Sequence, residues 1–493
     1  MAITAGSSLN SATASQQQTL ASNYIDFNQD MGWAQQYLPD LMEKEAEVFG
    51  PRTISGFLSQ VGAEESMTAD QVVWSEQSRL HLSYVCTVDA DGDTNGTLTI
   101  TTDIDGNAIT TTHGIRVNDV VLIAQAGVVV KALVVETPDS AVVTVEPYAT
   151  AALSTLSDGT ATVLVIGSEY GKGQSYTDHT GTYKTESRGA NTPTFKTFDN
   201  KPIIMKDYYE ISGSDVSQIG WVEVTSEDGG SGYMWYLKAE GETRARFTDY
   251  LEMSMLEAEK TAANSAIGFG ADGQVRGSAD AGADGAGTEG LFAAIEARGN
   301  LTSGVTGVNA ATDLAEFDAI LAEFDSQGAI EENMMFVNRA TSLAVDDMLA
   351  SMNSYGAGGT SYGVFNNSED MALNLGFSGF RRGSYDFYKS DFRYLNDKAT
   401  RGGINTRATS AAIRGVMVPA GTSTVYDQQL GKNLKRPFLH VRYRASQLES
   451  RKMKTWITGS VGAVTSTFDA MTVNFLSERC LVTQGANNFM LMN

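Results

Sequence analysis

The middle of the chain carries a long stretch of helical spacing. Between residues 230 and 265, apolar side chains recur every three or four positions, and charged side chains occupy the opposite face. We predict one helix of about 30 residues and about 45 Å, longer than a compact small domain needs. It is typical of a spine along an elongated, flat protomer. Its apolar stripe is Phe247, Leu251, Met255, Ala258 and Ala262, and its polar face is Glu240, Glu242, Arg246, Asp249, Glu252, Glu257 and Lys260.

Two extended runs lie on either side of an inserted segment. The first begins at Gln71 and continues to residue 85, and the second covers 194–212. Both show partial alternation of apolar and polar positions, so we predict that they pair as the arms of a long hairpin. An insertion is tolerated at such a place, because both of its ends lie close together.

The inserted segment, 86–170, has the pattern of a small all-β domain. It is rich in Thr, Val, Asp and Gly, and short alternating runs are separated by turn residues. We predict about six strands in a barrel or sandwich. The runs cover 97–103, 106–115, 119–125, 128–136, 141–148 and 161–167.

The rest of the chain alternates helices and strands. An amphipathic helix over 313–325, a buried strand over 332–338 and a helix over 339–352 predict a mixed α/β layer. Residues 437–493 are strand-like again, and a final extended run of this kind usually returns to an earlier sheet. At the other end, 1–24 reads as a flexible polar arm, 32–49 as a short helical segment and 268–290 as a Gly-rich mobile loop. The fold class is therefore α+β.

Composition limits the classes of function. The chain has 493 residues, and 35 Lys and Arg against 59 Asp and Glu give a net charge of −24. This charge disfavours a dedicated nucleic-acid binder and binding to anionic membranes. It does not disfavour loose enclosure of DNA, because an acidic inner wall keeps packed DNA from adhering. No apolar run is long enough to span a bilayer, and the first residues lack a signal-peptide pattern, so we expect synthesis in a cytoplasm.

Most candidate chemical motifs fail on spacing. Residues 167–173 resemble a phosphate loop but lack its spacing and the Ser or Thr after the Lys. The acidic loop with Asp89, Asp91, Asp93 and Asn95 lacks the bidentate Glu of a calcium loop, so a solvated hairpin turn is favoured over an adventitious ion. His81, His113, His179 and His440 fit no catalytic pattern. Cys86 and Cys480 are expected to be buried free thiols and not a bridge or a zinc site. We predict no catalytic, cofactor-binding or metal-binding residues.

One basic cluster reverses the acidic background, and only Glu449 interrupts it. The first interpretation is a solvated strand face. The second is a contact between subunits that pairs with acids such as Glu252 or Glu257 of a neighbour's spine helix, and the third is direct DNA contact. The cluster consists of Lys432, Lys435, Arg436, Arg442, Arg444, Arg451, Lys452 and Lys454.

The order of these elements resembles the major capsid proteins of tailed double-stranded DNA bacteriophages, the Hong Kong 97-like fold family. The likeness is carried by element order and by three segments rather than by a short motif. It covers most of the chain and leaves the 86–170 insert outside the shared core. The segments are WAQQYLPDLMEKEAEVFGPRTISGFLSQ, IGSEYGKGQS with TFDNKPIIMKDYYEISGSD, and the spine itself.

The resemblance implies a division of the chain. It assigns 1–70 to an N-terminal arm with short helices, and 71–85 with 171–212 to the strands of the extended-loop hairpin. Residues 86–170 are the inserted β domain. The peripheral domain with the spine helix takes 213–290 and 425–493, and the axial domain takes 291–424. Unlike many relatives, the chain starts without a long charged helical region, so scaffolding is expected from a separate protein.

The implied function is that of a non-enzymatic virion protein that assembles into pentamers and hexamers of an icosahedral head around double-stranded DNA. Portal, scaffolding and decoration proteins are the implied partners besides the chain itself, with DNA contacted non-specifically at most, no membrane and no cofactor. The alternatives are an encapsulin-like shell protein, which shares the fold, and another phage structural protein of the tail or baseplate. An acidic β-rich hydrolase is a further rival, which predicts a deep pocket with perturbed carboxylates.

Overall fold

A computed structural model of the chain contains two compact units, which are described separately. The body comprises 1–71 and 200–493, and the barrel unit comprises 72–199. The predicted arm at 1–24 and the helical segment at 32–49 lie outside the described residues, which begin at 56. The structure describes 56–493 except 62, 77–80, 82, 90–95, 104–105, 110–112, 138–140, 150–152, 174–195, 218–223, 226–230, 233–234, 262–266, 270–274, 277–285, 355–378, 408–411, 421, 428–431 and 462–463.

Six antiparallel strands of the barrel unit close into a barrel in the order β3-β4-β7-β6-β5-β8. Alternate side chains point inward and form one core, which includes Leu98, Val121 and Val163. The two-residue turn between β5 and β6 has positive φ at Ala126 and Gly127, as a tight hairpin requires. The strands are β3 (Ser83–Asp89), β4 (Gly96–Asp103), β5 (Asp119–Gln125), β6 (Val128–Glu136), β7 (Val142–Pro147) and β8 (Gly159–Ser168), with a 3-10 turn at Leu153–Thr155.

The barrel confirms the predicted all-β insert but uses a different set of strands. Five of the six predicted runs are strands, whereas the run at 106–115 contributes only an isolated bridge at Ala108 among its described residues. Its place is taken by β3, which the sequence assigned to the preceding hairpin. Among the described residues the outer hairpin is correspondingly shorter than predicted, because only β2 (Val72–Glu76) pairs with β9 (Lys196–Asn200).

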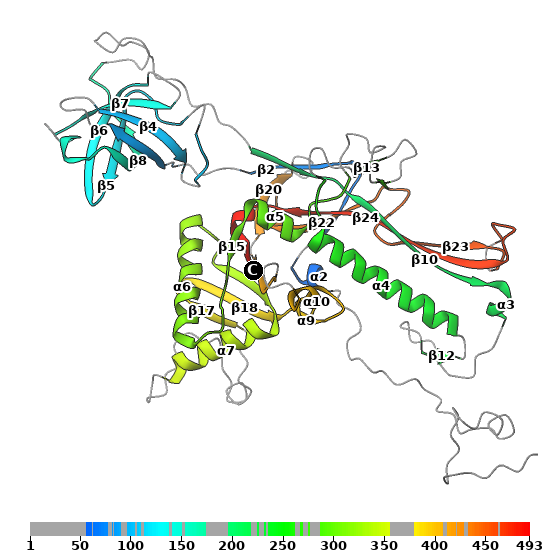
Figure 1. Ribbon diagram of the computed structural model, residues 1–493. Coiled ribbons are helices and arrows are strands. Elements are labelled where there is room, and N and C mark those ends of the chain that lie inside the picture. Colours follow the sequence, from blue (N-terminus) through cyan, green and yellow to red (C-terminus); the bar gives the residue numbers. More distant parts are fainter. Residues whose placement is uncertain are drawn as a thin grey trace, which may run out of the picture. The chain divides into compact units, whose positions relative to one another are not determined.

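The body contains a sheet built around one long strand, β24 (Ala470–Thr483). The order is β1-β22-β24-β10, and β23 also pairs with β24, beyond the end of β22. Strand β10 was predicted to pair with the segment after Gln71 but instead pairs along its whole length with β24. Figure 1 shows β10, β23 and β24 as long neighbouring arrows. The other strands are β1 (Ala63–Met67), β22 (Leu439–Arg444), β10 (Ile203–Ser212) and β23 (Lys454–Gly459).

The predicted spine is helix α4 (Trp235–Glu257), which packs on β10 and β24 (Figure 1). Phe247 and Leu251 of its apolar stripe are buried against Val473 and Phe475 of β24. The helix ends at Glu257 and not near residue 265. The chain beyond it pairs with a neighbouring segment: the Ala258 carbonyl accepts the Gly290 N–H at 2.7 Å, and the Thr261 N–H donates to the Ala286 carbonyl at 3.1 Å. This contact replaces further helical hydrogen bonds.

A second, six-stranded sheet of the body has the order β15-β25-β19-β16-β18-β17. Helices α6 and α7 cover a core that includes Phe317, Phe324 and Met348, so the predicted helix–strand–helix order is confirmed. The closing strand β25 lies between β15 and β19, which confirms a return to an earlier sheet. The strands are β15 (Asn300–Thr302), β16 (Glu332–Val337), β17 (Gly379–Arg382), β18 (Tyr385–Asp391), β19 (Gly415–Pro419) and β25 (Met490–Met492).

Short elements complete the described part of the body. Among them, α2 lies against α4 and β22, and part of the predicted 268–290 loop forms a two-residue ladder. The helices are α2 (Phe57–Val61), α3 (Gly213–Val216), α5 (Leu291–Arg298), α6 (Ala310–Gln327), α7 (Arg339–Ser354), α9 (Arg393–Asn396) and α10 (Arg401–Asn405). The paired strands are β11 (Val224–Thr225) with β12 (Ser231–Gly232), β13 (Gly268–Phe269) with β14 (Val275–Arg276), and β20 (Thr422–Asp427) with β21 (Lys432–Pro437).

Candidate functional site

The basic cluster found in the sequence forms a charged network around β22, β23 and β24. Among its described side chains, all five cations form ion pairs with acids of the same chain. The side chains of the other three cations, Lys432, Lys435 and Arg436, lie outside the described part. The cations are Arg442 and Arg444 on β22, Arg451 and Lys452 in the connection that follows, and Lys454 on β23.

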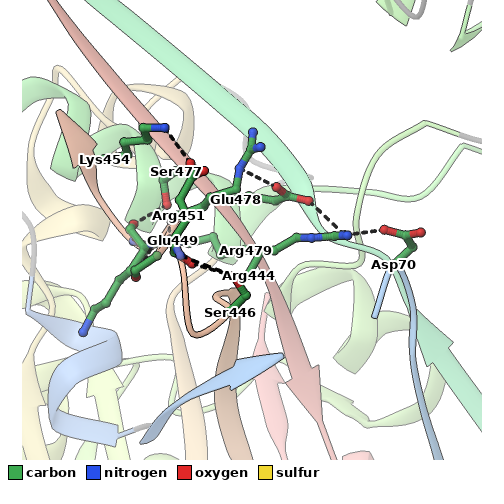
Figure 2. A network of polar contacts seen from close by, with 11 residues as sticks. Asp70, Arg444, Ser446, Glu449, Arg451, Lys454, Ser477, Glu478 and Arg479 are labelled. Carbon is green, nitrogen blue, oxygen red and sulfur yellow. Dashed lines mark hydrogen bonds and ion pairs between the residues drawn. The ribbon is translucent and has the colours of Figure 1, made fainter. Parts of the chain in front are cut away.

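The centre of the network is Glu478, a buried carboxylate on β24. It pairs with Arg451 at 2.8 Å and with Arg444 at 3.5 Å (Figure 2). Arg444 also pairs with Asp70, which lies 374 positions earlier in the chain. Because Glu478 is buried, its charge needs both guanidinium groups nearby. The network therefore ties the end of β22 and the turn after it to the long central strand.

A second row of ion pairs joins β1 to β22 and to the connection after it. The two strands run parallel with Glu65 opposite Arg442. Arg442 pairs with Glu65 at 2.8 Å, and Lys452 pairs with Glu64. Strand β1, at the edge of the sheet, is thus held by charge as well as by its backbone ladder.

Arg479 holds the connection between β22 and β23 through hydrogen bonds of its guanidinium group. Its guanidinium donates to the Lys452 carbonyl and to the Ser477 hydroxyl, both at 2.9 Å, and Ser477 donates to the same carbonyl at 2.6 Å. Burial lowers the pKa of Arg479, while Glu64 and Glu252 act in the opposite direction. The connection is consequently held by backbone and side chain together.

This bracing surrounds a hydrogen-bonded turn at 446–449 that presents one apolar side chain. The Ser446 N–H donates to the Glu449 carbonyl at 2.8 Å, and the Ser446 hydroxyl accepts the N–H groups of Leu448 and Glu449 at 3.3 Å. Lys454 fixes the Glu449 carboxylate at 2.6 Å. Leu448 at the tip is 98% exposed. Its apolar surface is therefore available to be removed from water by a partner.

A second turn, between β23 and β24, presents apolar side chains in a similar way. Val464 is 89% exposed and Phe468 is 61% exposed. The turn is closed by Thr465, whose hydroxyl accepts the Gly459 N–H at 2.9 Å and whose N–H donates to the Gly459 carbonyl at 2.9 Å. The described parts of two turns on strands adjoining β24 therefore offer apolar groups to a partner.

The pairing of this cluster with a neighbour's spine helix stays a prediction, and both acids named for it have partners within their own chain. Glu252 is buried and accepts the N–H groups of Gly56 at 2.8 Å and of Leu58 at 2.9 Å. Glu257 accepts the Tyr394 hydroxyl at 2.9 Å and pairs with Arg401 at 3.0 Å. Both carboxylates are thus engaged within the chain.

Glu252 is a structural residue that the sequence pattern placed on the wrong face of α4. Burial raises its pKa, and the hydrogen bonds from residues 56–58 act in the opposite direction. Its spacing of four residues from the buried Leu256 was an available signal. That spacing could not identify the partner of Glu252, which is a turn 194 residues earlier in the sequence.

The remaining candidate residues do not converge on a centre. Cys86 and Cys480 are buried free thiols, as predicted, and burial raises their pKa values to about 11 and about 12. Burial also lowers the pKa of His113, and His440 is buried on β22. His179 and most of the acidic loop after Asp89 lie outside the described residues. Across the described ranges, no three His, Cys, Asp or Glu residues are grouped as metal ligands would be.

Within the residues that the structure describes, no helix combines the length and the apolar character needed to cross a bilayer.

Comparison with known proteins gives distant structural matches over nearly the whole chain. No family model matches, and no curated protein matches. A solved structure from Gordonia phage Cozz covers 97% of this chain and 98% of its own, at 9% identity and a TM-score of 0.38. One from Microbacterium phage Oxtober96 covers 95% and 99%, at 8% identity and 0.38. The capsid of a native GTA particle covers 95% and 98%, at 10% identity and 0.38.

These matches are phage and capsid structures, the class of protein that the sequence resembles. Their identities and TM-scores are too low to assign a family or a function to this chain.

Proposed function

We propose that the chain is a structural shell protein of a tailed-phage type, whose copies assemble into a closed icosahedral head around double-stranded DNA. The observation that carries the proposal is Leu448, which is 98% exposed on a turn fixed by a network of ion pairs. Ordering charged side chains around a turn costs side-chain entropy. Contact of Leu448 with another subunit would offset part of that cost, because burial on assembly removes its apolar surface from water.

The arrangement of the body supports the same proposal. The sheet around β24 with α4 would be the peripheral domain, and the second sheet with α5, α6 and α7 would be the axial domain, with β25 assigned to the latter. The β2–β9 ladder would be the remaining strand pair of the extended loop, and the barrel an inserted domain. The acidic chain, at −24, would line a wall from which packed DNA is repelled.

The partners follow from this assignment. Copies of the chain would form pentamers and hexamers, and a portal, a separate scaffolding protein and decoration proteins would complete the head. An encapsulin-like shell is the alternative within the same fold. Particles from the native source that hold DNA would favour a phage head, whereas particles that hold a packaged enzyme would favour an encapsulin.

A substitution at the exposed anchor tests the proposal. Purified full-length chain is expected to form closed shells or capsomers by negative-stain microscopy and sedimentation. Leu448→Asp should lower the assembled fraction by about tenfold or more, since a charge replaces a buried apolar contact. The free protomer should keep its circular dichroism and melting temperature.

A matched control is Leu343→Asp, at an exposed leucine on α7 away from both turns. We expect this variant to assemble like the wild type. Wild-type assembly by Leu448→Asp would contradict the assignment of the turn as an anchor, and a wild-type chain that stays monomeric under all assembly conditions would contradict the shell function itself.

A further inference from the structure

Strand β10 has an open backbone edge. It is the last strand in the order β1-β22-β24-β10, and in the described part of the chain only β24 pairs with it. The Gly213 N–H reaches across to Asp469, which shows that odd-numbered positions direct their backbone groups to β24. The Tyr208 N–H donates instead to the side chain of Asp207 at 2.9 Å. Even-numbered positions from Ile204 to Glu210 therefore direct their backbone groups outward.

Large apolar side chains occupy two of these outward positions. Ile204 is 54% exposed and Tyr208 is 63% exposed, and Lys206 and Glu210 alternate with them. Proteins normally blunt such an edge with charge, a bulge or a covering segment, because it is a template for another strand. The ten-residue ladder with β24 runs without a register shift. The edge is thus continuous over the ten residues of β10 and suited to pairing.

We propose that β10 pairs antiparallel with β10 of a second copy of this chain, across a two-fold axis that passes through Tyr208. In this register Lys206 lies opposite Glu210 of the other copy, on both sides of the axis. Tyr208 lies opposite its own counterpart, and Met205 lies opposite Ile211. Opposite charges and aromatic pairs stabilise directly opposed positions in antiparallel strands, and a two-fold contact uses the same patch on both subunits.

Neighbouring registers lack this complementarity. An axis through Asp207 places that carboxylate opposite itself, and an axis through Lys206 does the same with two ammonium groups, both of which are destabilising. An axis through Tyr209 leaves Lys206 opposite Ser212 and forms no charge pair.

Among the described residues, Lys206 forms no ion pair within its own chain, so it is available to a second copy. Glu210 makes one long hydrogen bond, from Thr472 at 3.4 Å, and keeps other acceptor positions.

The pairing deepens the proposed function, because it names one contact between subunits and rests on the assignment that copies associate. Disulfide crosslinking of assembled full-length chain tests its register. Opposed hydrogen-bonded residues have Cα atoms about 5.5 Å apart, within the range of a disulfide. Tyr208→Cys should therefore form a dimer linked by a disulfide between the two copies of position 208, identified by mass spectrometry. Lys206→Cys alone should not, because the two copies of that position are offset by four residues, about 13 Å.

Exchanging the charges of Lys206 and Glu210 tests whether their pairing stabilises the association of two copies. Lys206→Glu should weaken self-association by about tenfold, because two like-charged pairs replace two opposite-charged ones. Glu210→Lys in the same chain should restore it, because the pairs are then re-formed with exchanged signs. Both positions are exposed, so the melting temperature of the protomer should not change. Failure of the second substitution to restore association would overturn the pairing.

The outcomes separate this pairing from the proposed function. Shells of the Tyr208→Cys variant that form without the disulfide dimer, or in which the introduced thiol crosslinks to another segment, overturn the pairing and leave the shell function standing. A disulfide dimer through position 208 in a chain that never forms shells supports the pairing and contradicts the function. A chain that neither crosslinks nor assembles overturns both.

Discussion

The barrel and the sheet around β24 solve the problem of strand edges in opposite ways. Each of the six barrel strands has two neighbours, so every ladder is closed within residues 83–168. Within the described residues the sheet around β24 instead ends at β1 and β10, and turns beside it expose Leu448 and Phe468. Closure makes a barrel self-sufficient, whereas an open edge with exposed apolar groups is satisfied only by a partner. The barrel thus has the properties of an independent module, and the body those of a building block.

Substitutions in the two hydrophobic cores should give the largest effects, and each should destabilise only one of the two regions. Phe475→Ala removes a ring that is buried against α4 and lies 6.1 Å from Phe247, centroid to centroid, and should destabilise the body by about 3–5 kcal/mol. Leu98→Ala opens a cavity in the barrel and should destabilise it by about 2–5 kcal/mol. Calorimetry should show two transitions, each shifted by only one of the two variants. Equal shifts of both transitions would mean that the units unfold together.

A smaller effect is expected at the charged network. Glu478→Gln leaves Arg444 and Arg451 without their shared carboxylate and should destabilise the body by about 2 kcal/mol, below the value for a fully buried pair because both guanidinium groups are partly exposed. The barrel transition should not move. Glu449→Gln, in the exposed part of the same network, is the control and should leave both transitions unchanged. Chemical denaturation followed by circular dichroism gives the two values.

The two thiols report on the two regions without changing their stability. Cys86 lies in the barrel core and Cys480 on β24, and burial raises their pKa values to about 11 and about 12. Since the thiolate is the reactive form, neither should react with a thiol reagent at pH 8 in the folded protein. Leu98→Ala should accelerate labelling of Cys86 alone, and Phe475→Ala that of Cys480 alone. Parallel acceleration of both sites in either variant would contradict the independence of the barrel.

The sequence predicted those parts of the fold that depend on local pattern. Alternation in 119–136 and helical spacing in 313–325 each led to the correct element, because one face of each is buried on a single core. Pairing over distance was harder. Strand β10 alternates equally well for any partner, and nothing local distinguishes β24 from the segment after Gln71.

The sequence predicted which basic residues form the candidate site but not which acids pair with them. A basic cluster against an acidic background was visible, and the structure shows that its described members pair with Glu64, Glu65, Asp70, Glu449 and Glu478 of the same chain. Four of these acids lie on other strands or segments, so only the folded sheet brings them near. Leu448 carried no sequence signal, because a leucine in a strand-like run is normally expected to be buried.

The distance between paired segments has a consequence for the time course of folding. Contacts of the barrel, such as Cys86 with Ala161, span 75 positions, whereas Asp70 and Arg444 are 374 positions apart. During translation all the barrel strands are therefore made long before the partners of β1 and β10. Until β22 and β24 are made, the apolar side chains of the unpaired strands stay exposed to water. Newly made chains should for that reason depend on chaperones in the body and not in the barrel.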